Sequence, residues 1–231
     1  MKNKIETRED WRKGRIKLLK KEKAFTKLRD ELSEMRRQLP WLKIEKEYKF
    51  KSFGEEKKFI DLFKDKSQLI VYHFMFAPNQ TEGCKMCSFW ADNFNSIIPH
   101  LKQRDVNFVC VSRGEVEKLE AFKKRMGWDF EWFSTENSGF NFDFNVSLKA
   151  GEKSEYNYVE YTSENVKDLP GISVFYKDEN NNIFHTYSCY ARELETFNTA
   201  YRFLDIIPKG RDEDSLPWGM AWVDYHDKYK S

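Results

Sequence analysis

The sequence lacks three features that would assign it to large classes of protein. No stretch reaches the ~18 consecutive apolar residues of a membrane span. Neither sign of charge dominates, because 40 Lys and Arg residues face 38 Asp and Glu residues, a net charge of +2 that gives no electrostatic case for nucleic-acid binding. Residues 1–10 contain no apolar core of a signal peptide, so we expect a cytoplasmic protein, in a compartment where thiols stay reduced.

Aromatic residues, in contrast, are abundant. They make up 16% of the 231 residues, including 20 Phe and 7 Trp, and this makes disorder over most of the chain improbable. The length allows one large domain, or one domain with extensions. We therefore expect a folded chain with a substantial core.

Two of the four cysteines form a Cys-x-x-Cys motif at residues 84–87, on the boundary between two predicted elements. An apolar run at residues 69–76 predicts a buried strand, and helically spaced apolar residues predict a helix from the motif to about residue 103. The N–H groups and the dipole at a helix start favour an anion such as a thiolate. Cys84 is thus the expected nucleophile, and Cys87, one turn later, the resolving thiol of a redox dithiol.

Neighbouring residues suggest supporting roles. Lys85 places a cation beside the nucleophile. His73, on the strand before the motif, could relay protons for Cys87, although such a histidine is more often a hydrogen-bonded core residue. The other two cysteines, Cys110 in a predicted strand and Cys189, are expected to have no catalytic role.

A metal half-site is the main chemical alternative for the motif. Structural zinc requires four ligands, and the sequence offers no second Cys-x-x-Cys and no His pair at familiar spacing. We therefore expect no metal and no cofactor.

The chain divides into three expected parts. Residues 1–40 form a charged amphipathic helix ended by Pro40, residues 41–205 a folded domain, and residues 206–231 a C-terminal tail that packs on the domain. Within the domain, strands and helices alternate as in an α/β fold with parallel strands. The expected elements are an edge strand at 41–50, a helical turn at 58–63, strands at 69–76, 106–112 and 128–133, a helix at 115–126 ended by Gly127, a further element at 140–147, a polar loop insertion at 149–168, a hairpin at 170–188 and a last helix at 194–204.

This order of elements resembles the thioredoxin-like fold, in its peroxiredoxin-like branch. The whole chain is similar to a bacterial domain-of-unknown-function family described as predicted dithiol–disulfide oxidoreductases. Residues 68–76, 83–94, 122–128 and 208–214 carry the resemblance, together with the N-terminal helix and residues 216–218. It implies an α/β thioredoxin-like fold in which helices flank a central mixed β-sheet, with an N-terminal helical extension and a C-terminal tail.

The resemblance also implies a cis peptide bond at Leu169–Pro170, facing the dithiol. In thioredoxin-like sites this bond turns the backbone before the hairpin toward the cysteines, where it can pair with an extended substrate chain. The sequence departs from thioredoxin itself in having Gly83 before the first cysteine, Lys-Met between the two cysteines, and no Asp on the preceding strand.

Three functions remain open at this stage. The leading one is a thiol–disulfide oxidoreductase that acts on a disulfide-containing protein or a small thiol. The second is a thiol-dependent peroxidase, because residues 78–84 nearly reproduce the peroxiredoxin motif Pro-x-x-x-Thr-x-x-Cys. In that motif the threonine, here Thr81, orients a peroxide, and Arg113 could complete the set, but the first gap is one residue short. The third is a non-catalytic binding protein with an aromatic groove near Cys84.

The apolar stripe on the N-terminal helix indicates a packing surface. Apolar side chains from Phe25 to Leu39 fall at spacings of three and four, and Leu18 continues the stripe beyond an interruption at Lys21. The stripe could pack on the chain's own domain or form a homodimer contact, and two clean heptads are short for a coiled coil. A homodimer through residues 16–39 is therefore one possible assembly. No nucleic-acid or membrane partner is expected.

Overall fold

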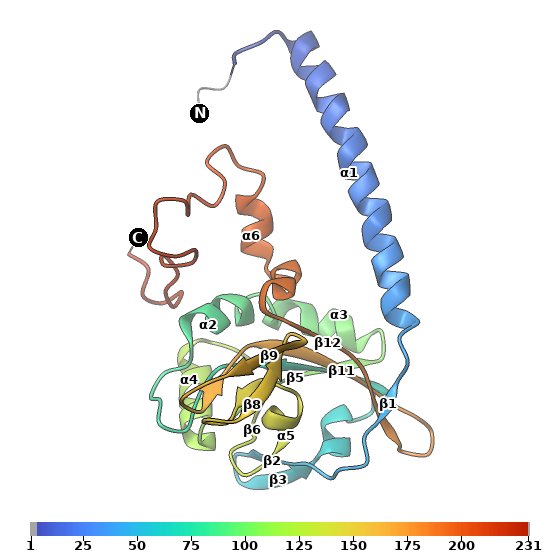
Figure 1. Cartoon of the computed structure of the whole chain (residues 1–231), viewed down its shortest axis with the longest axis vertical. Helices are drawn as coiled ribbons and strands as arrows, with labels where there is room; N and C mark the ends of the chain where they lie inside the picture. Colours follow the sequence, from blue (N-terminus) through green and yellow to red (C-terminus); the bar gives the residue numbers. More distant parts are fainter. Residues whose placement is uncertain (1–3, 231) are drawn as a thin grey trace. The chain divides into compact units, whose positions relative to one another are not determined.

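The computed structural model describes residues 4–230 and divides the chain into two compact units between Pro40 and Trp41. In the first unit the described chain contains one helix, α1 (Arg8–Arg37), drawn in blue in Figure 1. The Thr7 hydroxyl caps it by accepting a hydrogen bond from the backbone N–H of Asp10 at 3.2 Å. The helix expected ahead of Pro40 is thus present.

A mixed eight-stranded sheet organises the second unit (Figure 1). Its strands, in spatial order, are β1 (Leu42–Lys43), β12 (Ile183–Tyr190), β11 (Gly171–Lys177), β4 (Gln68–His73), β5 (Val106–Ser112), β6 (Glu131–Ser134), β2 (Lys49–Ser52) and β3 (Glu55–Lys58). The central strands β4, β5 and β6 are parallel, whereas β11 runs antiparallel to both β4 and β12. Two parallel strands beside an antiparallel hairpin, in the order β12-β11-β4-β5, are the core of the thioredoxin-like fold.

Helical elements cover both faces of the sheet and bury two separate cores. On the first face, side chains from α2 (Lys85–Ala91) and α4 (Val116–Arg125) pack among aromatic residues such as Tyr72 and Phe74. On the second face, the short helices η1 (Phe59–Phe63) and α5 (Phe140–Asp143) enclose a smaller core. The remaining elements are η2 (Asn95–Ile97), α3 (Ile98–Lys102), β7 (Ser147–Leu148), β8 (Lys153–Tyr156), β9 (Val159–Thr162), β10 (Lys167–Asp168), η3 (Ala191–Phe197) and α6 (Thr199–Leu204).

Several predicted elements differ in extent from those observed. The helix after the cysteine motif ends at Ala91, because the Asn93 amide donates to the carbonyls of Phe89 and Trp90 and interrupts the ladder. A second helix, α3, then starts with Pro99 in its first turn. The last helix is likewise split, since Asn198 ends η3 and caps α6. The predicted edge strand at 41–50 is reduced to the short strands β1 and β2.

The segment at 149–168, expected as a loop insertion, contains a β-hairpin. Strands β8 and β9 pair antiparallel through a two-residue turn at Asn157 and Tyr158, both with positive φ. The two strands expose most of their side chains, and the segment is mainly polar, so it lacks the apolar run by which the core strands are recognised.

The predicted cis bond at Leu169–Pro170 is wrong, because no peptide bond of the described chain is cis. The backbone there is held in an extended path from both sides. The Leu169 N–H donates to the Val146 carbonyl at 2.8 Å, and β10, just before it, pairs with β7. Gly171 then enters β11 opposite His73. The trans isomer, the usual one for X–Pro bonds, fits this continuous pairing.

The tail after Leu204 contains turns but neither strand nor α-helix up to residue 230. The carboxylate of Glu213 organises it, accepting hydrogen bonds from the Trp222 indole at 2.6 Å and the Tyr201 hydroxyl at 3.0 Å. Trp222 also packs edge-on against Phe89 of α2. The half-buried Glu213 therefore links the tail to α6.

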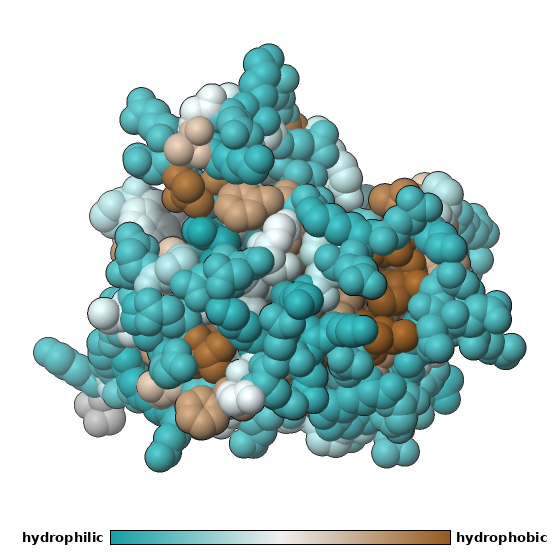
Figure 2. Space-filling view, turned by 90° about the horizontal axis from the view of Figure 1, so that it is seen from below, coloured by the Kyte–Doolittle hydropathy of each residue, from teal (hydrophilic) through white to brown (hydrophobic). Residues whose placement is uncertain are grey.

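The surface shown in Figure 2 is mainly hydrophilic, interrupted by separate hydrophobic areas rather than one continuous apolar patch. Within residues 4–230, no helix has the length and apolar character needed to cross a membrane.

Candidate active site

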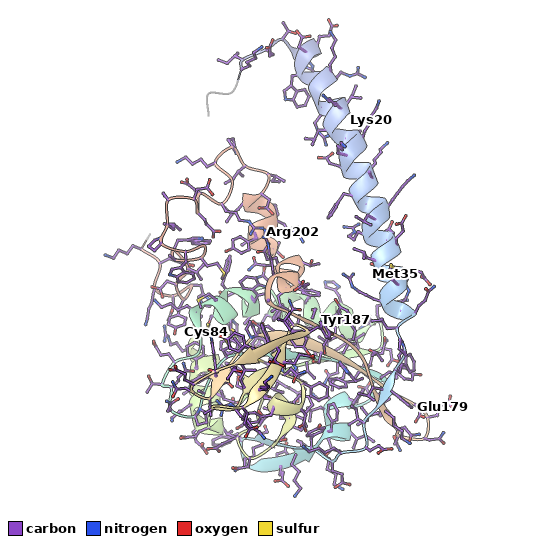
Figure 3. The ribbon with its side chains drawn as sticks, in the orientation of Figure 1. Lys20, Met35, Cys84, Glu179, Tyr187 and Arg202 are labelled. Carbon is purple, nitrogen blue, oxygen red and sulfur yellow. The ribbon has the colours of Figure 1, made fainter. Side chains whose placement is uncertain are left out.

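Cys84 lies where the chain leaves β4 and enters α2, and Figure 3 labels it beside this helix. It is the N-cap residue of α2, and its backbone N–H donates to the Met75 carbonyl at 3.1 Å. The preceding residue, Gly83, packs directly on the core. A Cβ atom there would lie 2.5 Å from the Phe74 ring and 3.0 Å from the Phe122 ring. Only glycine therefore lets the backbone come close enough to place Cys84 at the helix start.

The structure brings Cys84 and Cys87 together as a hydrogen-bonded pair of thiols with opposite pKa shifts. The hydrogen bond from the Cys87 thiol lowers the pKa of Cys84 to about 7; burial opposes this, and the backbone N–H groups of Cys87 and Met86 assist. Burial raises the pKa of Cys87 well above its usual value, and the bond to Cys84 adds to the rise. Cys84 is half-buried and Cys87 is buried. Near neutral pH a substantial fraction of Cys84 is thus thiolate, whereas the thiol of Cys87 behind it stays protonated.

The backbone around the dithiol is also fixed from the sheet. The Met75 N–H points at the Cys87 sulfur at 3.5 Å, and the Tyr72 hydroxyl donates to the Cys87 carbonyl at 3.4 Å. The Ser88 hydroxyl donates to the Cys84 carbonyl at 2.9 Å. Hydrogen bonds from Tyr72 of β4 and from Met75 just after it therefore hold the first turn of α2, and with it both cysteines, in place.

Two predicted supporting residues lie beside Cys84. Lys85 forms an ion pair with Asp224 of the tail at 3.0 Å, so a carboxylate neutralises its charge, and hydrogen bonds account for the acidity of Cys84. Thr81 is exposed and lines the same cleft as Cys84.

The structure does not bring His73 to the dithiol. Its side chain lies on the second face of the sheet, stacked on Phe140 with ring centroids 5.7 Å apart, whereas Cys87 belongs to the core of the first face. Burial, with a smaller contribution from His185, lowers the pKa of His73 to about 3, so the imidazole stays neutral at physiological pH. His73 is instead a core residue whose Nε2 bonds to the Ser173 hydroxyl at 2.9 Å.

Pro170 forms a hydrogen bond with the β8–β9 hairpin, which the sequence did not predict. The Tyr156 hydroxyl of β8 donates to the Pro170 carbonyl at 2.8 Å and accepts from the Ala191 N–H at 3.0 Å. Burial raises the pKa of Tyr156, and the nearby Cys87 adds to the rise. Tyr156 thus occupies the Pro170 carbonyl, which belongs to the backbone that the resemblance implied would pair with an extended substrate chain.

Arg113 forms an ion pair with Asp168 rather than a contact with Cys84. Its guanidinium makes two hydrogen bonds to the Asp168 carboxylate, at 2.7 and 3.0 Å, and both side chains are largely buried. Ser147 donates to the same carboxylate at 2.5 Å. The guanidinium is therefore a structural partner of Asp168 and is not offered to Cys84.

The tail supplies site residues that sequence reasoning missed. The Tyr225 hydroxyl donates to the Gly83 carbonyl at 2.6 Å, which pins the peptide before the nucleophile. Cations surround the Tyr225 ring: Arg125 lies 4.8 Å and Lys228 4.9 Å from its centroid. The only sequence signal was the aromatic character of the tail, and nothing local relates residue 225 to residue 83.

A cleft of about 550 Å³ opens beside Cys84. One wall is the loop at 79–86, and the other is formed by the tail. The tail residues that line it are Trp218, Ala221, Val223 and Tyr225. Within residues 4–230, no cluster of three or more His, Cys, Asp or Glu side chains is placed to hold a metal ion.

The pKa of Cys84 predicts a distinctive pH profile for alkylation. Because the thiolate is the nucleophile, the rate with iodoacetamide should rise with pH, reach half its maximum near pH 7 and level off above about pH 8. Cys110 is fully buried and its pKa is raised, so it should label far more slowly. Mass spectrometry of briefly treated protein measures both. A midpoint at ~8.5, as for an ordinary cysteine, or faster labelling of Cys110 or Cys189 would contradict the assignment.

Comparison with solved structures finds peroxiredoxin-type proteins of low identity. Peroxiredoxin Q from Xanthomonas campestris is 12% identical, with a TM-score of 0.47, over 71% of this chain and 96% of its own. The peroxidoxin BcpB from Mycobacterium tuberculosis is 12% identical, with a TM-score of 0.46, over 69% and 96%. A Bacteroides vulgatus protein, provisionally described as a thiol-disulfide oxidoreductase, is 15% identical, with a TM-score of 0.40, over 70% and 93%.

No curated protein matches the chain. The sequence profile of one family, described as "Bacterial protein of unknown function (DUF899)", matches residues 1–229. Because the match spans nearly the whole length, the chain belongs to this bacterial family of unknown function.

Proposed function

We propose that the protein is a thiol–disulfide oxidoreductase that uses Cys84 as nucleophile and Cys87 as resolving thiol. The observation that carries the proposal is the placement of a half-buried thiol at the N-cap of α2 beside a buried thiol one turn later, an arrangement that lowers the pKa of the first and raises that of the second. An ordinary structural cysteine needs neither shift, whereas sequential attack by two thiols uses both.

The reaction would proceed in two exchange steps. The Cys84 thiolate attacks one sulfur of a disulfide, so that a bond between Cys84 and the substrate forms, the substrate disulfide breaks and one thiolate leaves. Cys87 then attacks the Cys84 sulfur, so that the Cys84–Cys87 bond forms and the bond from Cys84 to the substrate breaks, and the proton of Cys87 passes to the departing sulfur, which leaves as the second thiol. Two electrons pass from the dithiol to the substrate, and the protein keeps a Cys84–Cys87 disulfide. A dithiol reductant would return the protein to its starting state.

The peroxidase alternative receives less support. Thr81 does lie at the cleft, but the guanidinium of Arg113 is bound to Asp168 and is not available to stabilise a reacting peroxide. A non-catalytic binding role would not require the opposed pKa values of the two thiols.

Turnover with dithiothreitol as donor separates these functions. The proposed enzyme should accelerate insulin reduction or the reduction of a small disulfide, and both it and a Cys87→Ser variant should consume hydrogen peroxide no faster than a Cys84→Ser variant. Peroxide turnover that survives in Cys87→Ser would favour a peroxidase that needs only Cys84. Absence of turnover with every disulfide would favour the binding protein.

A homodimer through residues 16–39 is a second, separate proposal. Within α1 no residue is buried, and exposed apolar residues such as Phe25, Leu28 and Leu32 lie at helical spacing. Sedimentation equilibrium of the full chain should show a dimer that the paired substitutions Leu28→Glu and Leu32→Glu dissociate, because two charges in an apolar seam are poorly solvated. A monomer at all concentrations would reject the contact.

A further inference from the structure

The cleft beside Cys84 has the dimensions and lining of a small-molecule site. Its volume of about 550 Å³ falls within the range of about 300–1,000 Å³ typical of ligand pockets. Met86 and the tail residues Trp218, Ala221 and Val223 supply apolar surface. The half-exposed Trp218 offers a broad ring at the entrance.

The charges on the rim of the cleft are already paired. Glu82 binds both Arg125, at 2.5 Å, and Lys228, at 3.2 Å, and Lys85 binds Asp224, at 3.0 Å. The other polar side chains that line the cleft, Asn79, Gln80 and Thr81, are uncharged. Apart from the Cys84 thiolate itself, the described lining therefore offers no unpaired charge, and it favours a ligand without net charge.

The backbone at Pro170 is less suited to pairing with an extended peptide. The Pro170 carbonyl already accepts a hydrogen bond from the Tyr156 hydroxyl, and the Ala191 N–H already donates to the oxygen of that hydroxyl. Backbone groups that could pair with a substrate chain at this point are thus engaged within the protein. The side of Cys84 that remains open is the one that faces the tail.

We propose that the cleft between residues 79–86 and 218–225 binds a small, uncharged disulfide with an apolar or aromatic body, which lies against Trp218 and Val223 while one sulfur meets Cys84. The inference rests on the proposed oxidoreductase function and names its substrate class. The exchange is the one already described: the protein dithiol is oxidised to the Cys84–Cys87 disulfide, and the bound disulfide is reduced to two thiols.

Single-turnover kinetics with two chromogenic aromatic disulfides test the proposal. The reduced full-length protein is mixed with 4,4′-dithiodipyridine, which is uncharged near neutral pH, or with 5,5′-dithiobis(2-nitrobenzoate), which carries two negative charges. Each rate is normalised to that of 2-mercaptoethanol with the same reagent. The neutral reagent should show a saturating rate, and the normalised rate of the dianion should be about tenfold lower or less.

Two variants and one control locate the binding. Trp218→Ala should raise the half-saturating concentration of the neutral reagent about tenfold while leaving the limiting rate within about twofold, because it removes apolar contact but no reacting group. Ala221→Glu should have a similar effect by placing a charge in the cleft. Trp41→Ala is the matched control, since Trp41 is 51% exposed, Trp218 is 53% exposed, and Trp41 does not line the cleft.

The outcomes distinguish a failure of the proposed substrate site from a failure of the proposed oxidoreductase function. Three results would overturn the substrate site. They are a rate that stays linear in reagent concentration, equal normalised rates for the two reagents, and equal half-saturating concentrations for Trp218→Ala and Trp41→Ala. If the Cys84–Cys87 disulfide still forms in those cases, the proposed function survives. If neither reagent produces that disulfide, both the function and the site are rejected.

Discussion

Replacing Cys84 with serine is expected to lower the rate of disulfide exchange by roughly three orders of magnitude or more. A serine hydroxyl is not ionised near neutral pH, so it cannot replace a thiolate whose pKa is about 7. Cys87 is buried and holds its proton, so it is a poor substitute for the lost nucleophile. The decay of a chromogenic disulfide under single-turnover conditions measures the loss.

Cys87→Ser should behave differently, because it leaves the nucleophile in place. The first exchange step still occurs, but the mixed disulfide at Cys84 has no intramolecular exit and accumulates. Non-reducing mass spectrometry should find one substrate fragment attached to Cys84. Cys110→Ala serves as the control, since this thiol is buried in β5 and should affect neither step. If Cys84→Ser accumulates the adduct and Cys87→Ser does not, the two roles are reversed.

Gly83→Ala is expected to destabilise the protein by about 1–3 kcal/mol and to disturb Cys84 at the same time. The new methyl group would meet the ring of Phe74 at 2.5 Å, and both Phe74 and Phe122 are buried, so neither ring can move aside cheaply. If the backbone shifts to relieve this clash, the Gly83 carbonyl moves away from the Tyr225 hydroxyl that donates a hydrogen bond to it. Urea unfolding measures the stability, and the alkylation rate at pH 7 measures the thiolate.

A matched glycine provides the comparison. Gly14 lies inside α1, and a Cβ atom there would have no neighbour within 4 Å. Gly14→Ala should therefore be neutral or stabilise the helix by about 0.5–1 kcal/mol. Wild-type stability and reactivity in Gly83→Ala would show that the close packing under Cys84 is not required.

Elements with strong local signals could be predicted from the sequence. The strand at 106–112 has the same bounds in the structure because three valines, Phe108 and Cys110 give it strong β-propensity. The helix before Gly127 ends as expected, with this glycine at a positive φ of 64°. The motif at 84–87 was sufficient to place both thiols at the start of a helix.

Features that depend on distant partners could not be predicted. The β8–β9 hairpin uses Asn157 and Tyr158 where an Asn-Gly turn would have been recognisable. The choice of the trans isomer at Pro170 and the attachment of Tyr225 to Gly83 are set by segments remote in sequence. The position of His73, in contrast, follows from the alternation of side chains along β4. Its two neighbours, Tyr72 and Phe74, belong to the first core together with Cys87, so the His73 side chain lies on the other face of the sheet.

Equilibration of the protein in thiol–disulfide buffers of known potential tests the central claim most directly. The account predicts one reversible two-electron transition in which Cys84 and Cys87 join in a disulfide and the ratio of oxidised to reduced protein changes tenfold per ~30 mV. Because the pKa of Cys84 is about 7, rather than strongly depressed, the midpoint should lie toward the reducing side, below about −200 mV. Peptide mapping that finds no Cys84–Cys87 disulfide even in the most oxidising buffer would contradict it.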